Sequence, residues 1–327
     1  MNEARRIFVS GATGAIGRRV VPLLVHAGHE VIAVGRTPEK RLQLERLGAR
    51  AVEVDLFDPV QVKEAIQGAE VLCNLATAVP RPDFRLLLRR SWRAMDHVRQ
   101  QVSANLVEAA LVTPSVQRMI QESFAPTYPD SGDAWVDEDV PPRPANYNRS
   151  VLDAEAQAER FTRAGRIGVV LRFGMFYGPG DASTLQLVDG AKRGWYPLPG
   201  RQEGYTSWVA HEDAASAVAA ALGVPPGVYN IIENEPMRRR ELANGIAGLL
   251  GARSPRFLPA WTAHLAGAVG ETLARSLRIS NRKFRGASGW EPRYRTTLDG
   301  FEAVIERRDR ESTGEDLAVC KPQYGRG

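Results

Sequence analysis

The chain has 327 residues, of which 43% are hydrophobic and 25% charged, as in an ordinary soluble globular protein of one or two closely joined domains. Its formal net charge is +5, and the basic residues are scattered, which argues against a nucleic-acid-binding surface. Cys73 and Cys320 make neither a disulfide framework nor a metal site. A predicted strand begins within a few residues of the start, and no apolar run approaches about 18 residues. We therefore expect no signal peptide, no membrane span and a cytoplasmic protein.

The first part of the chain alternates short apolar runs with segments of helical periodicity. Strands are predicted at residues 6–12, 30–36, 51–56 and 69–77, and helices at residues 15–28, 39–48 and 59–68. Strand–helix units in this order form an open parallel sheet with helices on both faces. The sequence therefore predicts an α/β fold, namely a Rossmann-type doubly wound parallel sheet.

The first strand–helix crossing carries a glycine pattern typical of dinucleotide binding. The segment GATGAIG places Gly11, Gly14 and Gly17 between the first strand and the first helix. Gly11 permits a tight turn, Gly14 lets the backbone approach a pyrophosphate, and Gly17 lets helix and strand pack closely. Backbone N–H groups at the helix start then face the phosphates. This pattern predicts a dinucleotide cofactor.

The residue at the end of the second strand bears on which nucleotide is bound. Proteins that bind NAD usually carry an acidic residue there, which holds the adenosine ribose. This chain reads VGRTPEK, with Arg36 at that position and Lys40 behind it. An arginine forms a charge-assisted pair with a 2′-phosphate, whereas a carboxylate repels it. We therefore expect NADP rather than NAD; the alternative is that Arg36 is a solvated surface residue.

Further motifs extend this pattern along most of the chain. They are VDLFD (54–58), NLATAVPRP (74–82), DEDVPPRPANYNRSVLDAEAQAERF (137–161), VVLRFGMFYGPG (169–180), YTSWVAHEDAASAVAAAL (205–222), GVYNIIENEPMRRRELANGIA (227–247) and ASGWEPRYRTTLDGFEAVI (287–305). With these motifs, the chain resembles the extended short-chain dehydrogenase/reductase family, in its epimerase/dehydratase branch. The resemblance implies an NAD(P)-dependent oxidoreductase with a Rossmann-type cofactor domain and a smaller C-terminal substrate-binding lobe.

The resemblance also assigns residues to the cofactor. In the family, the pair matched by Asp55 and Leu56 holds the adenine, and the segment after the fourth strand lines the nicotinamide-side ribose. The residues expected to contact the cofactor are Gly11, Thr13, Gly14, Ala15, Ile16, Gly17, Arg36, Asp55, Leu56, Leu75, Ala76, Thr77, Tyr147 and Phe173. No metal ligand is expected.

The family's chemistry uses a serine, a tyrosine and a lysine, with the last two spaced Tyr-x-x-x-Lys on one helix face. Tyr147 matches the tyrosine and Glu155 an acidic residue after the motif, but Val151 stands at the lysine position. A tyrosine without that lysine has a pKa of about 10 and is protonated near neutral pH. It donates a proton to the alkoxide formed by carbonyl reduction but is a poor base for alcohol oxidation. We expect Tyr147 to be this donor; the alternative is an aromatic residue packed at a helix start.

The serine is expected at the end of the fifth strand. In the segment QESFAPTY, Ser123 has about the right place, although an apparent one-residue insertion lengthens the link to Tyr128. Ser123 either orients the substrate carbonyl or bonds the backbone at the strand end. Glu122, Thr127 and Tyr128 compete with it for the substrate role.

These patterns divide the chain into a cofactor domain, a lobe and a tail. Residues 1–180 and 201–222 are expected to form the NADP-binding Rossmann domain, residues 181–200 and 223–306 the substrate-binding lobe, and residues 307–327 a flexible, charged and aperiodic tail. Residues 257–277 are predicted as one apolar helix that covers the pocket or supports a dimer. Oligomeric state stays open, although the family often forms homodimers through helices of the cofactor domain.

Three functions are compatible with these features. The leading hypothesis is an NADP-dependent reductase of a carbonyl in a small organic or secondary metabolite, with Tyr147 as proton donor and Ser123 or a neighbour orienting the carbonyl. The second is a sugar-nucleotide epimerase or dehydratase, which the missing lysine disfavours. The third is a catalytically silent NADP-binding regulator. The substrate depends on pocket shape built from loops, which the motifs do not define.

Overall fold

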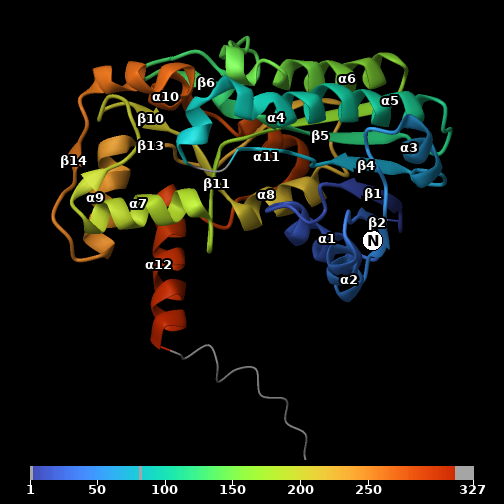
Figure 1. The fold of residues 1–327 in the computed structure, drawn as a ribbon, viewed down its shortest axis with the longest axis horizontal. Coiled ribbons are helices and arrows are strands. Elements are labelled where there is room, and N and C mark those ends of the chain that lie inside the picture. The colour runs from blue at the N-terminus through green and yellow to red at the C-terminus, as the bar shows by residue number, and fades with distance from the viewer. Residues whose placement is uncertain (1–2, 81–82, 314–327) are drawn as a thin grey trace, which may run out of the picture.

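The structure is a computed structural model that describes residues 3–80 and 83–313 (Figure 1). Its centre is a seven-stranded sheet with the order β12-β7-β5-β4-β1-β2-β3, in which every neighbouring pair is parallel. The strands are β1 (Arg6–Ser10), β2 (Glu30–Val34), β3 (Arg50–Val52), β4 (Val71–Asn74), β5 (Arg118–Phe124), β7 (Ile167–Phe173) and β12 (Gly227–Ile231). The order reverses between β1 and β4, which is where such folds bind their ligand. The predicted doubly wound sheet is confirmed.

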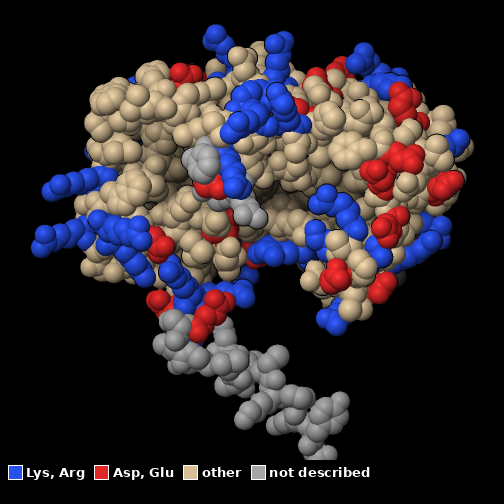
Figure 2. All heavy atoms as spheres, viewed as in Figure 1, with Lys and Arg blue, Asp and Glu red and all other residues tan. Residues whose placement is uncertain are grey.

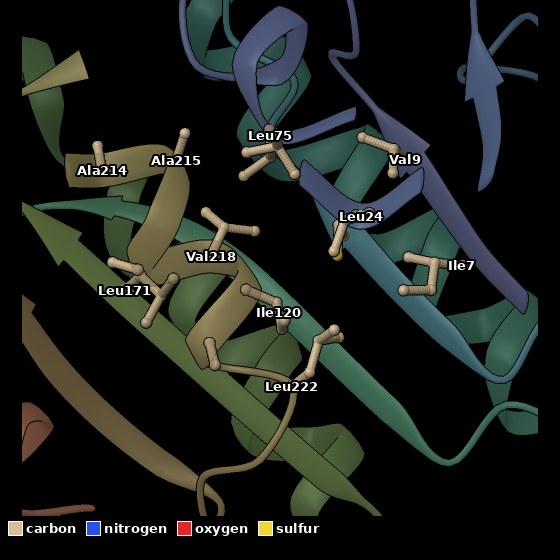
Figure 3. Packing of buried hydrophobic residues seen from close by; sticks show 14 of the residues in the cluster. Ile7, Val9, Leu24, Leu75, Ile120, Leu171, Ala214, Ala215, Val218 and Leu222 are labelled. Atoms are coloured by element: carbon tan, nitrogen blue, oxygen red, sulfur yellow. The ribbon is translucent and has the colours of Figure 1, made fainter. Parts of the chain in front are cut away.

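Helices cover both faces of this sheet. One face carries α1 (Gly17–His26), α2 (Pro38–Arg46), α8 (His211–Ala220) and α11 (Arg282–Ser288), and the other carries α3 (Pro59–Ala65), α5 (Ser103–Leu111) and α6 (Val151–Arg163). Figure 3 shows the first core, where Leu24 and Val218 from the helices share one cluster with Ile7, Ile120 and Leu171 from the strands. Because both faces are buried, the strands are apolar along their length instead of alternating.

Local sequence sets where several helices begin. α2 begins after Thr37 and α3 after Asp58, and both side chains accept backbone N–H groups of the first helical turn. In both helices a proline follows the cap, at a position where its missing N–H is not needed.

α4 (Arg93–His97) continues through a π-helical turn, Val98–Val102, into α5. Within the described residues, no helix is long and apolar enough to cross a membrane.

A smaller lobe lies beside the sheet (Figure 1). Its helices are α7 (Ala182–Lys192), α9 (Arg239–Leu249), α10 (Gly267–Ala274) and α12 (Thr297–Thr313). Short strands pair as β8 (Met175–Tyr177) with β11 (Trp208–Ala210), β9 (Trp195–Tyr196) with β14 (Arg256–Phe257), β10 (Tyr205–Thr206) with β13 (Met237–Arg238), and β6 (Trp135–Val136) with β15 (Arg278–Ile279). A separate core that includes Leu187, Trp208, Leu242 and Phe301 stabilises the lobe.

Two domain boundaries differ from the sequence expectation. Residues 227–231 were expected in the lobe, but they form β12 at the edge of the central sheet, paired along β7, and α11 packs on the same sheet. The flexible tail was expected from residue 307, but α12 continues to Thr313, supported by an ion pair between Arg307 and Glu311 one turn apart. The rest of the expected tail, residues 314–327, lies outside the described residues.

Two helix predictions are also corrected. Residues 257–277 do not form one helix, because a 3₁₀ segment, Ala260–Ala266, ends at Gly267, whose φ of +56° interrupts the path before α10 continues. Tyr147 does not open a helix. It lies in a short 3₁₀ turn, and α6 begins only at Val151.

We predict that Gly17→Ala destabilises the protein, because the added Cβ atom would lie 2.2 Å from the Gly11 carbonyl oxygen. The expected loss in the free energy of unfolding is about 1–3 kcal/mol, measured by urea denaturation. Gly248→Ala in α9 is the matched control, since a Cβ atom there meets nothing within 4 Å. It should leave stability unchanged or raise it by about 0.5–1 kcal/mol. Equal stabilities for the two variants would contradict this account of the loop.

Candidate functional site at the ends of the parallel strands

The glycine loop follows β1 and lies against the end of β4. Gly11 has a φ of +71°, and a Cβ atom there would lie 2.3 Å from the carbonyl oxygen of Leu75. A Cβ atom at Gly17 would meet the Gly11 carbonyl, whereas the nearest atom to one at Gly14 is 3.1 Å away. Gly11 and Gly17 are therefore required by the fold itself. Gly14 is exposed, as close approach of a phosphate to the backbone requires.

Asn74, a residue of the site that was not among those expected from the sequence motifs, holds the loop and the neighbouring strands together. Its Oδ1 accepts from the Ser10 hydroxyl at 2.6 Å, and its Nδ2 donates to Ser103 Oγ at 3.1 Å and to Gln121 Oε1 at 2.9 Å. The backbone N–H of Leu75 donates to the Ser10 carbonyl. The residues expected to line the ribose follow this fixed strand end directly: Leu75, Ala76 and Thr77.

Arg36 and Asp55 lie at the surface, after β2 and β3. Arg36 is exposed, and no described residue forms an ion pair with its guanidinium. The Asp55 carboxylate accepts the N–H of Phe57 at 3.0 Å, and the carbonyl of Leu56 accepts from Asn105 Nδ2 at 3.0 Å. These bonds fix the turn that the resemblance assigns to the adenine.

This edge of the sheet fits a nicotinamide dinucleotide. The crowded glycines bring the loop backbone close to the start of α1, and the N–H groups of a helix start are suited to bind a pyrophosphate. The side chains expected around it in the loop are at least partly accessible: Thr13, Ala15 and Ile16.

Tyr147 is covered by the lobe. It lies in the 3₁₀ turn Asn146–Asn148, and its ring packs on Trp92 with centroids 4.5 Å apart. Val269 of α10 belongs to the same apolar cluster, and only 6% of Tyr147 is exposed. The tyrosine is thus enclosed between the cofactor domain and α10.

The surroundings of Tyr147 keep its phenol protonated. Burial raises its pKa, and a hydrogen bond with Thr272 and the positive charges of Arg275 and Arg99 oppose that rise. The Thr272 hydroxyl donates its own proton to the Ala268 carbonyl at 2.8 Å, so its oxygen is left to accept from the phenol. Tyr147 is therefore protonated near neutral pH, as expected for a proton donor.

The family's lysine position carries no charge here, because it is occupied by Val151. This apolar side chain is fully buried at the start of α6. Arg99 in the π-helical turn is 4% exposed, and its Nη1 donates to Asn148 Oδ1 beside Tyr147. Its Nη2 lies 3.6 Å from Glu122 Oε1, and burial raises the pKa of that carboxyl. The sequence HVRQQV reads as a polar helix face, so nothing in it marked Arg99 as a buried residue.

Ser123 belongs to a buried polar network that joins α6 to the sheet. Its hydroxyl donates to Glu155 Oε1 at 2.5 Å, and Arg172 donates to both Glu155 oxygens at 2.8 and 2.7 Å. Arg172 also donates to the Tyr128 hydroxyl at 2.8 Å, which donates to Asn230 Oδ1 at 2.9 Å. Ser123 and Tyr128, both expected as candidates for substrate contact, are thus engaged in a network that does not include Tyr147.

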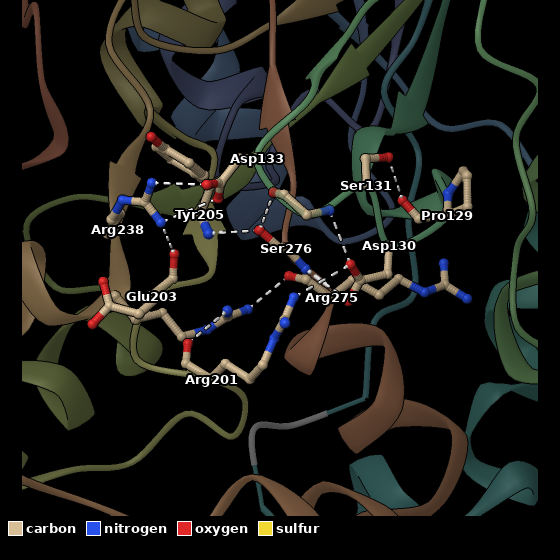
Figure 4. A network of polar contacts seen from close by, with 12 residues as sticks. Pro129, Asp130, Ser131, Asp133, Arg201, Glu203, Tyr205, Arg238, Arg275 and Ser276 are labelled. Atoms are coloured by element: carbon tan, nitrogen blue, oxygen red, sulfur yellow. Dashed lines mark hydrogen bonds and ion pairs between the residues drawn. The ribbon is translucent and has the colours of Figure 1, made fainter.

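A second polar network joins the lobe to the turn after β5 (Figure 4). Arg275, directly after α10, donates to the backbone carbonyl of Tyr128 at 2.9 Å, and the N–H of Ser276 donates to Asp130 at 3.3 Å. These bonds hold α10 in place over Tyr147.

Figure 2 shows a hollow between the lobe and the cofactor domain, with basic side chains along its edges.

Phe173, which was expected to contact the cofactor, and His211 of the YTSWVAHEDAASAVAAAL motif lie in packed surroundings. Phe173 is fully buried in the sheet core, with its ring 5.5 Å from that of Phe176. His211 opens α8, lies 5.7 Å from the same Phe176 ring, and is 3% exposed. Burial lowers the pKa of His211 to about 4, so it is a neutral, packed side chain.

Curated relatives match the chain over most of its length. A 3-diazoavenalumate denitrifying reductase of a Streptomyces species is 31% identical over 90% of this chain and 99% of its own. A ketoreductase of Stigmatella aurantiaca that acts on a farnesyl dihydroquinoline oxide is 28% identical over 83% of this chain and 81% of its own. A 2-alkyl-3-oxoalkanoate reductase of Stenotrophomonas maltophilia is 27% identical over 84% of each chain. All three relatives are named as reductases.

Solved structures share the fold at low sequence identity. A UDP-glucose 4-epimerase of Thermotoga maritima, solved with UDP-glucose, has a TM-score of 0.73 and 20% identity, over 94% of this chain and 99% of its own. A human epimerase family protein with NADPH has a TM-score of 0.74 and 20% identity, over 92% and 99% of the two chains. At these identities the likeness establishes the fold alone.

The profile of the NAD(P)H-binding family matches residues 11–222, from the glycine loop to the end of the segment after α8. This match covers the strands of the central sheet other than β1 and β12, the turn with Tyr147 and the whole of α6. The reductase relatives and the epimerase-like fold agree with this match. The chain belongs to the NAD(P)H-binding family and is an NAD(P)-dependent oxidoreductase with the fold of the extended short-chain dehydrogenases/reductases.

Proposed function

We propose that the protein reduces a carbonyl group of a small organic or secondary metabolite and that Tyr147 supplies the proton. The observation that carries this proposal is a buried, protonated phenol enclosed between the cofactor domain and the lobe. NAD(P)H, when bound, supplies a hydride. The carbonyl carbon gains that hydride, the C=O π electrons move to oxygen, and Tyr147 protonates the resulting alkoxide.

Surroundings of the site favour a substrate with an apolar body. The 3₁₀ turn after residue 83 and the segment before α10 both lie next to α10, which covers Tyr147. Large apolar side chains in and beside these segments are exposed: Val79, Leu87, Trp261 and Leu265. Contact with an apolar substrate chain would bury such side chains. The farnesyl and alkyl groups named for two of the relatives are of this kind.

We infer that NADP is the preferred nucleotide. Arg36 is exposed beyond β2, and no described residue neutralises it, so its guanidinium is available for a 2′-phosphate. No carboxylate stands at that position to hold an unphosphorylated ribose.

A second reaction deserves a test because of the Streptomyces relative, which is named for removing nitrogen from a diazo compound. A diazonium group accepts a hydride at its terminal nitrogen and then loses N2, which leaves a C–H bond. This reaction needs no proton from Tyr147, so the absence of a lysine at Val151 would not impair it. The sugar-nucleotide epimerase alternative is less favoured, because a protonated phenol is a poor base for oxidising an alcohol.

Arg36→Asp should weaken NADPH binding at least about tenfold, since it removes a charge-assisted bond and adds a repelling charge. NADH binding should not fall. Titration of nucleotide fluorescence measures both affinities. Arg46→Asp at the far end of α2 is the matched control, because it makes the same charge change on another exposed arginine. Tighter binding of NADH than NADPH by the unaltered protein would contradict the assignment of Arg36.

Tyr147→Phe should lower the turnover of a carbonyl substrate by about 100- to 10,000-fold, because the proton donor is lost. NADPH binding should stay unchanged, and absorbance of the reduced nicotinamide measures the rate. If the variant still releases N2 from a diazo substrate at the normal rate, the second reaction is supported. Full carbonyl turnover in Tyr147→Phe would rule out its role as the proton donor.

Ser123→Ala should lower the free energy of unfolding by about 1 kcal/mol, because one buried hydrogen bond to Glu155 is removed. Turnover at a temperature where the variant is folded should remain close to normal. Denaturation and steady-state kinetics on the same sample provide the two measurements. A large fall in turnover at unchanged stability would instead place the Ser123 hydroxyl on the substrate.

A further inference from the structure

The electrostatic surroundings of Tyr147 differ from the family pattern. The lysine position is the fully buried Val151, and Arg149 on the same segment is exposed. The positive charges that act on the phenol come from other segments of the chain, from Arg275 and Arg99. One belongs to the lobe and the other to the cofactor domain, so the two arginines reach Tyr147 from different parts of the fold.

Arg99 is built into the cofactor domain. It is 4% exposed, its Nη1 donates to Asn148 Oδ1, and its Nε has no hydrogen-bond partner among the described residues. Burial of a guanidinium with an unused donor lowers the stability of the fold. Such a group in a native structure calls for an explanation, and a functional role is one. The residue lies in the π-helical turn between α4 and α5, and such turns occur frequently at functional sites.

Glu122 neutralises Arg99 only in part. The closest pair of charged atoms is 3.6 Å apart, and Glu122 Oε2 has no partner within the described structure. Burial raises the pKa of Glu122, and the nearby Glu155 carboxylate raises it further, against the effect of Arg99. The carboxyl is therefore a weaker counter-charge than an exposed glutamate, and Arg99 keeps a positive field around Asn148 and Tyr147.

Arg275 adds a second positive charge from the lobe. Its Nη1 donates to the carbonyls of Pro126 and Tyr128, which fixes the guanidinium beside the turn after β5. Asp130 and Glu271 act on Arg275 from further away, but neither forms an ion pair with it among the described contacts. Its charge reaches Tyr147 only while the lobe is docked on this turn.

We propose that Arg99 and Arg275 together replace the missing lysine and stabilise the Tyr147 phenolate that forms when the phenol gives its proton to the substrate oxygen. The proposal rests on the proposed function, in which Tyr147 is the proton donor. No atom of either arginine takes part in bond making, so both are positioning residues. The phenolate regains a proton from water after the product forms.

The test measures the ionisation of Tyr147 without any substrate. A difluorotyrosine, whose phenol ionises near neutral pH, is placed at position 147 and followed by fluorine NMR across a pH series. Arg99→Gln and Arg275→Gln should each raise its pKa by about one pH unit, and the double variant should raise it further. Arg99→Lys should preserve the original value because it keeps the charge.

Arg118→Gln is the matched control for loss of a buried arginine. Arg118 begins β5 and donates to the carbonyls of Ala221 and Val224, far along the strand from Glu122. Its substitution should leave the ionisation of residue 147 unchanged even if stability falls. Val151→Lys in the Arg99→Gln background should lower the pKa again, because it restores the charge that the family places there.

An unchanged pKa in both single variants and in the double variant, with the NMR spectrum of a folded protein, would overturn the proposal. An equal rise in Arg118→Gln would also overturn it, because the effect would then be general to any lost arginine. A selective rise together with full carbonyl turnover in Tyr147→Phe would support the electrostatic assignment while removing the proposed proton transfer. The two proposals therefore fail in distinguishable ways.

Discussion

The buried ion pair between Glu155 and Arg172 is the interaction on which the site depends. It ties α6 to β7, and through the Ser123 hydroxyl it ties both to β5. Loss of one partner from such a pair leaves a buried charge and typically destabilises a protein by about 3–5 kcal/mol. The turn with Tyr147 directly precedes α6, so this pair sets its position. Glu155 therefore matches the family pattern for a structural reason, although Val151 does not.

Much of this architecture follows from local sequence, and the remainder depends on contacts between distant segments. Strands buried on both faces and the glycines of the first crossing have local signatures, which is why the sheet and the loop were predictable. Residues 227–231 were misplaced because a strand at the sheet edge is defined by its pairing with β7. Arg99 and Arg275 were missed because only the folded chain brings them to Tyr147. The exposed Arg36 could be singled out from the sequence because its proposed role depends on its place after a strand.

The arrangement favours one direction of hydride transfer. A buried phenol whose pKa is raised keeps its proton over the whole neutral range and releases it only to a stronger base, such as an alkoxide. Two arginines supplied by two domains make that release depend on docking of the lobe over the site. Proton donation is thereby linked to docking of the lobe over the substrate. This linkage suits a reductase better than an enzyme that must remove and return protons within one catalytic cycle.

The central claim is that Tyr147 acts as an acid and not as a base. The most direct test compares the pH dependence of hydride transfer in both directions in single-turnover experiments, followed by the absorbance of the reduced nicotinamide. The account predicts reduction at a constant rate through neutral pH, with a decline only above the usual tyrosine pKa of about 10. Oxidation of the product alcohol should be slow at neutral pH. Rapid oxidation with a rate that rises through neutral pH would contradict the account, because Tyr147 would then be acting as a base.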